Sequence, residues 1–167
     1  MCASCVHTRS VHDAVNPLEV GAALVWSAPG RILVQRRPAN ASFGGGALEL
    51  PGGKIEAGET PKAAVVREIA EEWGRAAAWL EIGPHLHTIK HDYRPRGPRV
   101  RLHVFHARLR QGVSEDALLA AIDGSMAGLV EVLGVEALAP DAFLEADRSL
   151  VGALRSGRIP WPFDDAR

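Results

Sequence analysis

The sequence lacks an excess of charge of either sign. The chain has 19 lysine and arginine residues against 20 aspartate and glutamate residues, and its formal net charge is −1. A chain without a positive excess has no extended field that would hold a nucleic-acid backbone or an anionic membrane. We therefore expect neither a nucleic-acid polymer nor a membrane among its partners, and any bound phosphate must be met by a local group of residues.

Long apolar runs are also missing. No run approaches the roughly 18 residues that a membrane-spanning helix needs. The opening MCASCVHTRS has no apolar core like that of a secretory signal. These two absences lead us to expect a cytoplasmic protein.

Cysteine is scarce, which argues against a disulfide-stapled scaffold. The two cysteines, Cys2 and Cys5, form a single C-x-x-C near the N-terminus. Such a motif can be half of a zinc site or a redox pair, but no second cysteine pair follows downstream. We interpret residues 1–16 as a loose N-terminal extension.

The remaining composition is that of one ordinary globular domain. The chain is 47% hydrophobic and 23% charged, and no segment repeats at a fixed period. We expect one domain over residues 17–157 and a C-terminal tail over 158–167, from which Trp161 and Phe163 can pack back on the body.

Turn residues and apolar periodicity divide the domain into short elements. We expect a hairpin of strands 18–27 and 31–37 around Ala28-Pro29-Gly30, then a glycine-rich loop with a short apolar piece at 47–50. Further strands are expected at 80–91, 99–109 and 129–133, and helices at 115–123 and 141–154.

A longer helix is predicted from Thr60-Pro61 to Gly74, because threonine is a good N-cap, proline suits the first turn and glycine suits the C-terminal exit. At helical spacing its carboxylates gather on one face and its apolar residues on the other. The acidic face is Glu68, Glu71 and Glu72, and the expected core face is Val65, Val66, Ile69, Ala70 and Trp73. Clustered carboxylates favour a hard cation such as Mg²⁺ or Mn²⁺, although a solvated acidic face is the alternative.

The context of this helix carries a specific resemblance. The segment GGKIEAGETPKAAVVREIAEEWG resembles the Nudix box, G-x5-E-x7-R-E-U-x-E-E-x-G-U, where U is apolar. The matching residues are Gly53, Glu59, Arg67, Glu68, Ile69, Glu71, Glu72 and Gly74, and only Arg75 departs from the pattern. The resemblance implies the Nudix fold, an α/β/α sandwich with a mixed, curved β-sheet.

The resemblance also implies the roles of the box residues. Glu68, Glu71 and Glu72 would bind the divalent cation together with the carbonyl of Gly52. Arg67 would serve as an orienting partner of Glu59, since arginine does not deprotonate. Glu68 is the leading candidate for the base that takes a proton from the attacking water, and Glu59 is the second candidate.

Within the family, LELPGGKIEAGETPKAAVVRE looks like the MutT-type branch. That branch hydrolyses nucleoside triphosphates, including 8-oxo-dGTP and CTP, to the monophosphate and pyrophosphate with Mg²⁺ or Mn²⁺ as the cofactor. We expect a small-molecule nucleotide substrate and a monomer or homodimer. The alternatives are a Nudix pyrophosphatase for nucleoside diphosphate-linked compounds, such as ADP-ribose or dinucleoside polyphosphates, and a nucleotide-sensing module without turnover.

Two residues are candidates for nucleotide binding. Arg37 matches a MutT-type position that contacts the nucleotide, or is simply a charged strand end. Asp147 stands where enzymes selective for 8-oxoguanine carry asparagine, and an ionised aspartate only accepts hydrogen bonds. This departure favours another base edge, such as the exocyclic amine of cytosine, while an N-capping or surface role for Asp147 is the alternative.

Two further expectations concern metal ligands. MutT-type enzymes place another metal-binding glutamate where this sequence has Met126, and Asp123 could replace it. His85, His87 and His91 have the parity of one strand face, and His103 and His106 lie on the neighbouring strand. Cross-strand polar packing or the lining of a base pocket is expected, with a second, softer metal site as the alternative.

Overall fold

The computed structural model describes residues 16–163, so the predicted N-terminal cysteine motif lies outside the described residues. In chain order the elements are β1 (Leu18–Ala28), β2 (Arg31–Arg36), β3 (Leu48–Glu49), β4 (Gly52–Lys54), α1 (Pro61–Trp73), β5 (Leu80–Asp92), β6 (Arg99–Leu109), α2 (Glu115–Ala121), β7 (Val130–Gly134) and α3 (Arg148–Arg155). None of the helices in this part of the chain has the length and apolar composition that crossing a membrane requires.

All strands belong to one mixed sheet. Its order is β3-β2-β1-β6-β5, with β4 paired to β1 and β7 paired to β2. Strands β1 and β6 run parallel from Leu18 to Trp26 of β1, whereas β1 and β2 form the predicted antiparallel hairpin. The expected mixed sheet is therefore confirmed.

One edge of β1 is shared by two strands. The first half pairs with β4, where Gly21 lies opposite Gly53 and Ala22 opposite Gly52. The second half pairs with β2 from Val25 onward. Because β4 and β2 leave β1 from the same edge, the sheet opens between them.

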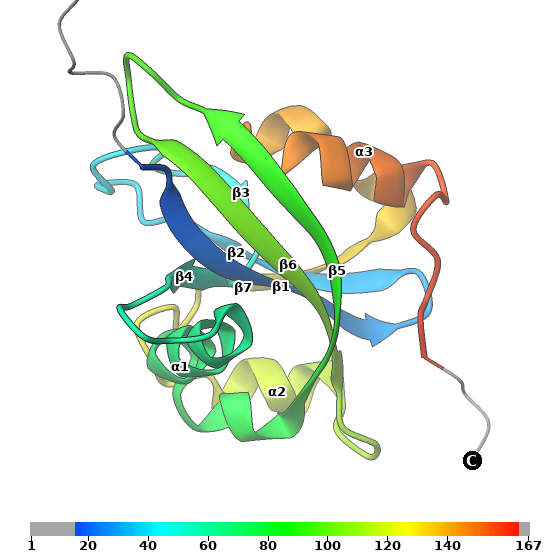
Figure 1. Cartoon of the computed structure of the whole chain (residues 1–167). Coiled ribbons are helices and arrows are strands. Elements are labelled where there is room, and N and C mark those ends of the chain that lie inside the picture. The colour runs from blue at the N-terminus through cyan, green and yellow to red at the C-terminus, as the bar shows by residue number, and fades with distance from the viewer. Residues whose placement is uncertain (1–15, 164–167) are drawn as a thin grey trace, which may run out of the picture.

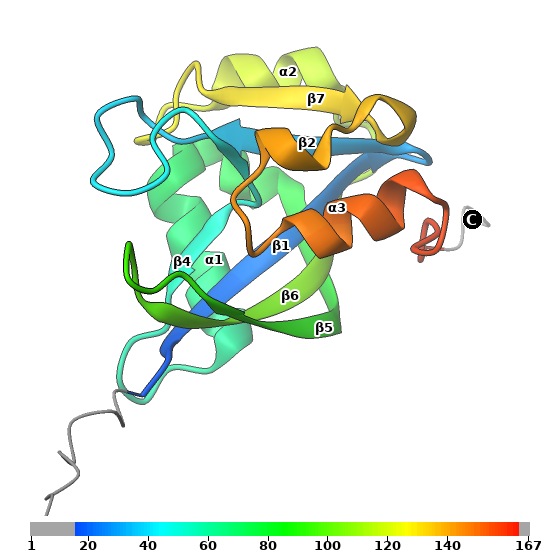
Figure 2. The same cartoon turned by 90° about the horizontal axis from the view of Figure 1, so that it is seen from above.

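Helices cover both faces of the sheet (Figures 1 and 2), with α1 and α2 on one face and α3 on the other. Successive side chains of β1 point to opposite faces of the sheet and so belong to two separate hydrophobic cores. Leu24 and Trp26 face α3, whereas Ala23 and Val25 face α1 and α2. The α/β/α sandwich expected from the sequence is confirmed.

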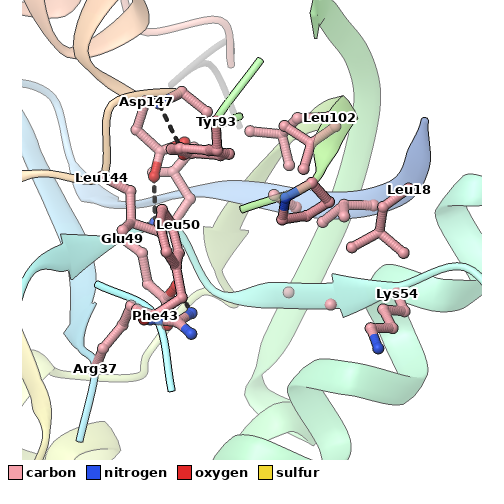
Figure 3. A pocket seen from close by; sticks show the side chains of 17 residues that line it. Leu18, Arg37, Phe43, Glu49, Leu50, Lys54, Tyr93, Leu102, Leu144 and Asp147 are labelled. Carbon is pink, nitrogen blue, oxygen red and sulfur yellow. Dashed lines mark hydrogen bonds and ion pairs between the residues drawn. The ribbon is translucent and has the colours of Figure 1, made fainter. Parts of the chain in front are cut away.

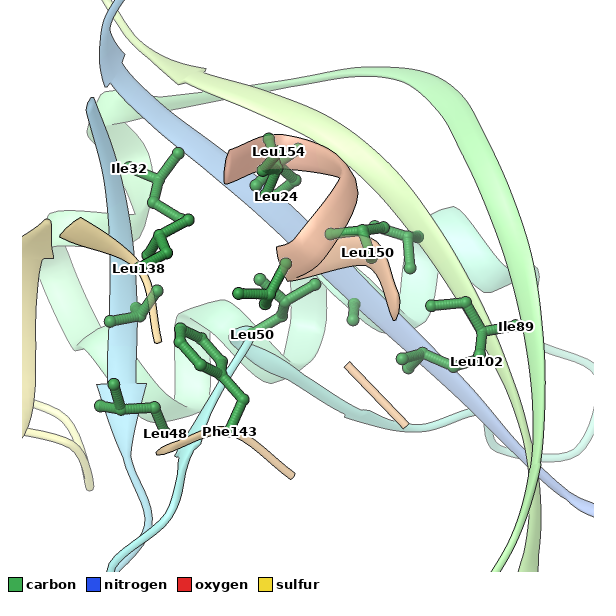
Figure 4. Close-up of a cluster of buried hydrophobic side chains, with 14 of the residues drawn as sticks. Leu24, Ile32, Leu48, Leu50, Ile89, Leu102, Leu138, Phe143, Leu150 and Leu154 are labelled. Atoms are coloured by element: carbon green, nitrogen blue, oxygen red, sulfur yellow. The ribbon is translucent and has the colours of Figure 1, made fainter. Parts of the chain in front are cut away.

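The core under α3 closes one side of the opening in the sheet. Leu150 and Leu154 of α3 lie over Leu24 of β1, and Phe143 lies beside Leu50 (Figure 4). Burying each of these side chains contributes about 1.5–3 kcal/mol. This core fixes the segment before α3 against the sheet.

Helix α1 has the ends that the sequence predicts. The Thr60 side chain accepts a hydrogen bond from the Ala63 amide at 3.2 Å, Pro61 occupies the first turn, and Gly74 takes a positive φ of 61° at the exit. A Cβ at Gly21 would come within 2.7 Å of the Pro61 carbonyl oxygen. Glycine at this position of β1 therefore lets the start of α1 lie directly against the strand.

The predicted core face of α1 is too wide. The buried residues are Ala64, Val65, Ile69 and Trp73, whereas Val66 is 52% exposed and Ala70 is exposed as well. Both lie on the side of α1 that faces β5, where a hollow of about 540 Å³ separates the two elements. The expectation for Val66 and Ala70 was wrong because α1 packs through a narrower stripe than its apolar pattern indicates.

The last helix is shorter than predicted. The expected helix 141–154 is replaced by a 3₁₀ turn at Pro140–Ala142 and an α-helix that begins at Arg148. Between them Phe143 forms a parallel β-bridge with Leu48. Phe143 and Leu144 are held beside β3, and residues 145–147 form a turn before the helix begins.

The histidines of β5 do not share one face. The strand is irregular on both sides of His85, so that His85 lies opposite Phe105 and His87 opposite Val104. Phe105 and Val104 are neighbours in β6 and contribute to opposite cores. The parity argument failed because a β-bulge shifts the alternation of side chains.

Cross-strand polar packing is nevertheless present. His85 Nε2 lies 3.0 Å from Thr88 Oγ1, which lies 3.3 Å from His103 Nδ1. At the other end of the sheet, Trp161 packs edge-on against Trp26 with ring centroids 5.8 Å apart. The predicted return of the C-terminal tail to the body of the domain is thus confirmed.

Candidate active site

The acidic face of α1 lies directly on β4. The backbone amide of Gly52 donates a hydrogen bond to Glu72 Oε2 at 3.2 Å. A Cβ at Gly53 would overlap the carboxylate of Glu68. The two glycines therefore bring the backbone of β4 up to two carboxylates of the helix.

Arg67 organises the carboxylates around it. Its guanidinium donates to both oxygens of Glu59, at 3.1 Å from Nε and 3.0 Å from Nη2, and to the carbonyl oxygen of Lys54 at 2.8 Å. Its Nη1 also reaches Glu68 Oε1 at 2.9 Å and Glu71 Oε1 at 3.4 Å. The paired contact with Glu59 is the geometry expected of an orienting arginine.

The carboxylates differ in their electrostatic setting. Hydrogen bonds from Arg67 hold the pKa of Glu59 below its usual value, so Glu59 remains ionised. Burial raises the pKa of Glu72 to about 8, and the nearby charges of Glu49 and Glu68 add to the effect. The surroundings of Glu72 thus disfavour its ionised form unless a positive charge is supplied nearby.

The donor set fits a hard divalent cation. Glu68, Glu71 and Glu72 present only carboxylate oxygens, and Gly53 leaves room beside Glu68 that a side chain would fill. As they stand, the Asp, Glu, His and Cys side chains of residues 16–163 form no group of three around one point. Arg67 forms ion pairs with the carboxylates of Glu68 and Glu71.

The loop before β7 caps α1. The amide of Met126 donates to the carbonyl oxygen of Glu72 at 2.8 Å, and Met126 is buried. Asp123 Oδ1 accepts from the amide of Arg75 at 2.9 Å, and its Oδ2 pairs with the Arg75 guanidinium at 3.3 Å. Asp123 therefore holds the exit of α1 through the amide and the guanidinium of Arg75, whose side chain is exposed.

A cavity of about 290 Å³ lies on the other side of β4 (Figure 3). Gly52 and Gly53 line it, so the same two residues touch both the cavity and the acidic face of α1. Aromatic and aliphatic walls come mainly from Phe43, Tyr93, Leu18 and Leu102, and charged groups come from Arg37, Glu49, Lys54 and Asp147. The structure thus brings both predicted nucleotide-binding residues, Arg37 and Asp147, to one cavity.

Asp147 is buried at the wall of this cavity. Only 3% of its surface is exposed, and Oδ2 accepts from the Leu50 amide at 3.4 Å. It precedes α3, but its side chain makes no capping hydrogen bond. Burial raises the pKa of Asp147 to about 7, and the charge of Glu49 adds to this. Neither the N-capping nor the surface alternative for Asp147 agrees with this geometry.

Arg37 is fixed by two contacts. Its Nη1 lies 2.6 Å from Glu49 Oε2, and its Nε donates to the carbonyl oxygen of Phe43 at 3.0 Å. Burial still raises the pKa of Glu49, despite the arginine. Arg37 is therefore tied into the cavity wall rather than extended into solvent as a free strand end.

Sequence reasoning missed three residues of the site. Glu49 stands between two leucines of LELPGG, and Gln35 follows the apolar run of β2 and precedes two arginines; both are buried. Tyr93 packs edge-on against Phe43 with centroids 4.7 Å apart, and its hydroxyl accepts from the Ala146 amide at 3.0 Å. A polar residue between apolar ones was the available signal for Glu49, whereas the polar sequence after Gln35 gave no sign of its burial.

Comparison with known proteins agrees with this architecture. The sequence profile of the NUDIX domain matches residues 15–152. The chain belongs to the NUDIX family. Its solved neighbours include a MutT NUDIX hydrolase from Burkholderia pseudomallei, with a TM-score of 0.63 and 22% identity over 82% of this chain and 97% of that one. A MutT protein from Methanosarcina mazei Go1 gives a TM-score of 0.61 and 19% identity over 86% and 97% of the two chains.

Curated relatives match this NUDIX protein over part of their length. An 8-oxo-dGTP diphosphatase of Escherichia coli (strain K12) is 46% identical over 60 residues, which are 36% of this chain and 46% of the relative. A CTP pyrophosphohydrolase of the same organism is 36% identical over 89 residues, or 53% and 61% of the two chains. The first of these matches thus spans about half the length of the relative.

Alanine substitutions at the two glycines of β4 should have different effects. Gly52→Ala should strain the backbone, whereas Gly53→Ala should displace the Glu68 carboxylate. Gly53→Ala places a methyl group against the flexible end of Glu68, so we expect weaker Mn²⁺ binding with little loss of thermal stability. Gly52→Ala meets the backbone of Gly21 and starts from a φ of 145°, so we expect a loss of about 1–3 kcal/mol. Thermal melts and Mn²⁺ titration of both variants provide the check; equal melting temperatures for the two would contradict this reading of β4.

Asp147→Asn should change the pH dependence of stability. The folded-state pKa of about 7 exceeds the unfolded value of about 3.9, so the folded wild type loses stability as pH rises between these values. Asparagine keeps an acceptor for the Leu50 amide without the charge beside Glu49, Arg37 and Tyr93. Relative to wild type, the variant should gain at least about 1 kcal/mol, or about 2–4 °C in melting temperature, between pH 5 and pH 8. Parallel melting profiles of the two proteins would exclude a raised pKa at Asp147.

Proposed function

We propose that this NUDIX protein hydrolyses nucleoside triphosphates, including modified ones, to the nucleoside monophosphate and pyrophosphate with Mg²⁺ or Mn²⁺. The observation that carries the proposal is the position of Gly52-Gly53, which line the cavity on one side and contact Glu68 and Glu72 on the other. A nucleotide whose base occupies the cavity can therefore pass its phosphates along β4 to the acidic face of α1.

The cavity has the composition of a nucleobase site. Phe43 and Tyr93 offer aromatic walls, and Leu102 offers an aliphatic one. Ligand sites of this kind are mostly apolar and place a few polar groups where they fix orientation. Here Asp147 and Arg37 are those polar groups, and we assign them to recognition of the nucleotide.

The identity of the base depends on Asp147. As a carboxylate it accepts a hydrogen bond from the exocyclic amine of cytosine or from the donor edge of guanine, and in its protonated form it can also donate to a carbonyl oxygen. The relatives named 8-oxo-dGTP diphosphatase and CTP pyrophosphohydrolase represent both classes of base. The aspartate in place of asparagine favours the cytosine edge.

The cation would be held by Glu68, Glu71, Glu72 and the carbonyl oxygen of Gly52. When bound, it supplies positive charge that stabilises the negative charge developing on the phosphates and lowers the pKa of a coordinated water. The pKa of Glu72, raised by burial, and the exclusively oxygen donor set support this assignment.

The protein's own groups have separate tasks in the proposed reaction. Water is added across the anhydride bond that joins the monophosphate to the pyrophosphate, and one proton of the water must be accepted. Both oxygens of Glu59 are engaged by Arg67, and its pKa is lowered, which makes Glu59 a weak base and an anchor for Arg67. We therefore assign proton acceptance to Glu68, with Arg67 as the positioning residue.

We also infer the setting and assembly from the sequence expectations. A nucleotide-pool enzyme of this kind would act in the cytoplasm, as a monomer or homodimer, on free nucleotides rather than on a polymer. Sanitation of modified nucleotides is the role that fits such a substrate range.

A pyrophosphate-release screen tests the proposed reaction. The wild type is assayed with Mg²⁺ or Mn²⁺ on the ordinary nucleoside triphosphates, 8-oxo-dGTP, 5-methyl-dCTP, ADP-ribose and dinucleoside polyphosphates. We expect release from triphosphates and at least a 100-fold lower kcat for Glu72→Gln, about the effect of losing one charge-stabilising group, with no loss of melting temperature because glutamine keeps an acceptor for the Gly52 amide. Asp147→Asn should change the order of preferred bases at a similar maximal rate.

The screen separates the alternatives. Cleavage of only diphosphate-linked compounds would replace the triphosphate assignment and retain the catalytic centre. Nucleotide binding without any turnover would favour a sensing module. An active Glu72→Gln variant would remove Glu72 from the cation site.

A further inference from the structure

Gln35 connects the two halves of the site. Its side chain is fully buried, with 0% exposed, on the face of β2 that meets α1. Trp73 Nε1 of α1 donates to Gln35 Oε1 at 3.0 Å. A fully buried amide requires hydrogen-bond partners, and the residues that precede it in β2, Ile32–Val34, are apolar and buried.

The orientation of the amide follows from its partners. The indole of Trp73 is a donor only, so the oxygen of Gln35 must face it and the NH₂ group must point the other way. On that side lie two carboxylates. Glu49 Oε1 is 3.5 Å from Nε2, and Glu72, the residue before Trp73 in α1, has its pKa held down by the Gln35 amide against the effect of burial. One neutral NH₂ group therefore stands between a carboxylate of the cavity and a carboxylate of the acidic face.

We propose that Gln35 is a positioning residue whose NH₂ group aims the Glu72 carboxylate at the cation site and holds Glu49 apart from it. This inference rests on the proposed function, since it concerns the residue assigned to the cation. Among the described residues, the Gly52 amide donates a hydrogen bond to the Glu72 carboxylate at 3.2 Å. Loss of the Gln35 donor would leave Glu72 with that single restraint.

The two carboxylates should respond unequally to the loss of Gln35. Glu49 keeps its ion pair with Arg37 at 2.6 Å, which is shorter than its 3.5 Å contact with Gln35. Within residues 16–163 Glu72 forms no ion pair of this kind, since Arg67 pairs with Glu59, Glu68 and Glu71 instead. We therefore expect cation binding and kcat to fall while the nucleotide KM changes little.

Gln35→Met and Trp73→Phe form a matched pair. Both lose the hydrogen bond between Trp73 and Gln35 and both disturb the core, but only Gln35→Met loses the NH₂ donor. Direct titration of Mn²⁺ into the substrate-free protein, followed by electron paramagnetic resonance, reads the cation site without turnover. Gln35→Met should bind Mn²⁺ about 10–100-fold more weakly, the usual effect of removing a group that orients a metal ligand, whereas Trp73→Phe should stay within about threefold of wild type.

A second variant guards against misfolding. Gln35→Glu keeps the length of the side chain and an acceptor for Trp73, but it replaces the NH₂ donor with a carboxylate oxygen, so we expect weakened Mn²⁺ binding again. The same variants should lower kcat about 10-fold or more on the preferred substrate and change its KM by less than about threefold.

The outcomes distinguish this inference from the proposed function. Wild-type Mn²⁺ affinity in Gln35→Met or Gln35→Glu would overturn the positioning role, as would equal losses in Gln35→Met and Trp73→Phe. Absence of Mn²⁺ binding by the wild type would overturn it as well. A wild type that binds Mn²⁺ but cleaves nothing would refute the proposed reaction, while the effect of Gln35 on Mn²⁺ affinity would still decide this inference.

Discussion

The close contact between α1 and β4 is the constraint on which the rest of the site depends. It exists because Gly53 has no side chain where the Glu68 carboxylate meets the strand, and because the Gly52 amide donates a hydrogen bond to Glu72. Gly21 of β1 permits the same closeness at the start of the helix. A Cβ at any of these three glycines would force the backbone or a carboxylate to move. The close packing of α1, β1 and β4 therefore depends on glycine at these positions.

The divergence of β2 and β4 from one edge of β1 turns this contact into a site. The cavity lies at the opening between β2 and β4. The segment before α3 pairs with β3 and places Asp147 in the cavity wall. Burial in this packed region raises the pKa of Glu72, and the nearby charges of Glu49 and Glu68 add to the effect. A cation held by the carboxylates of α1 would offset this concentration of buried acidic groups.

Local signals in the sequence predicted the parts that depend on local interactions. The ends of α1 follow from Thr60, Pro61 and Gly74, and the pairing of Arg67 with Glu59 follows from the box. The exposure of Val66 and the change of face between His85 and His87 could not be predicted, because each depends on how far one element lies from another or on a bulge. The burial of Asp147 required the pairing of Phe143 with Leu48, a contact between residues far apart in the chain.

Crystals grown with Mn²⁺ and a non-hydrolysable nucleoside triphosphate would test the central claim most directly, because anomalous scattering locates the ion independently of the nucleotide. The account predicts manganese between the Gly52 carbonyl and the carboxylates of Glu68 and Glu72, with the base in the cavity beside Asp147. Manganese at another place, or a base bound outside that cavity while the phosphates avoid β4, would contradict it.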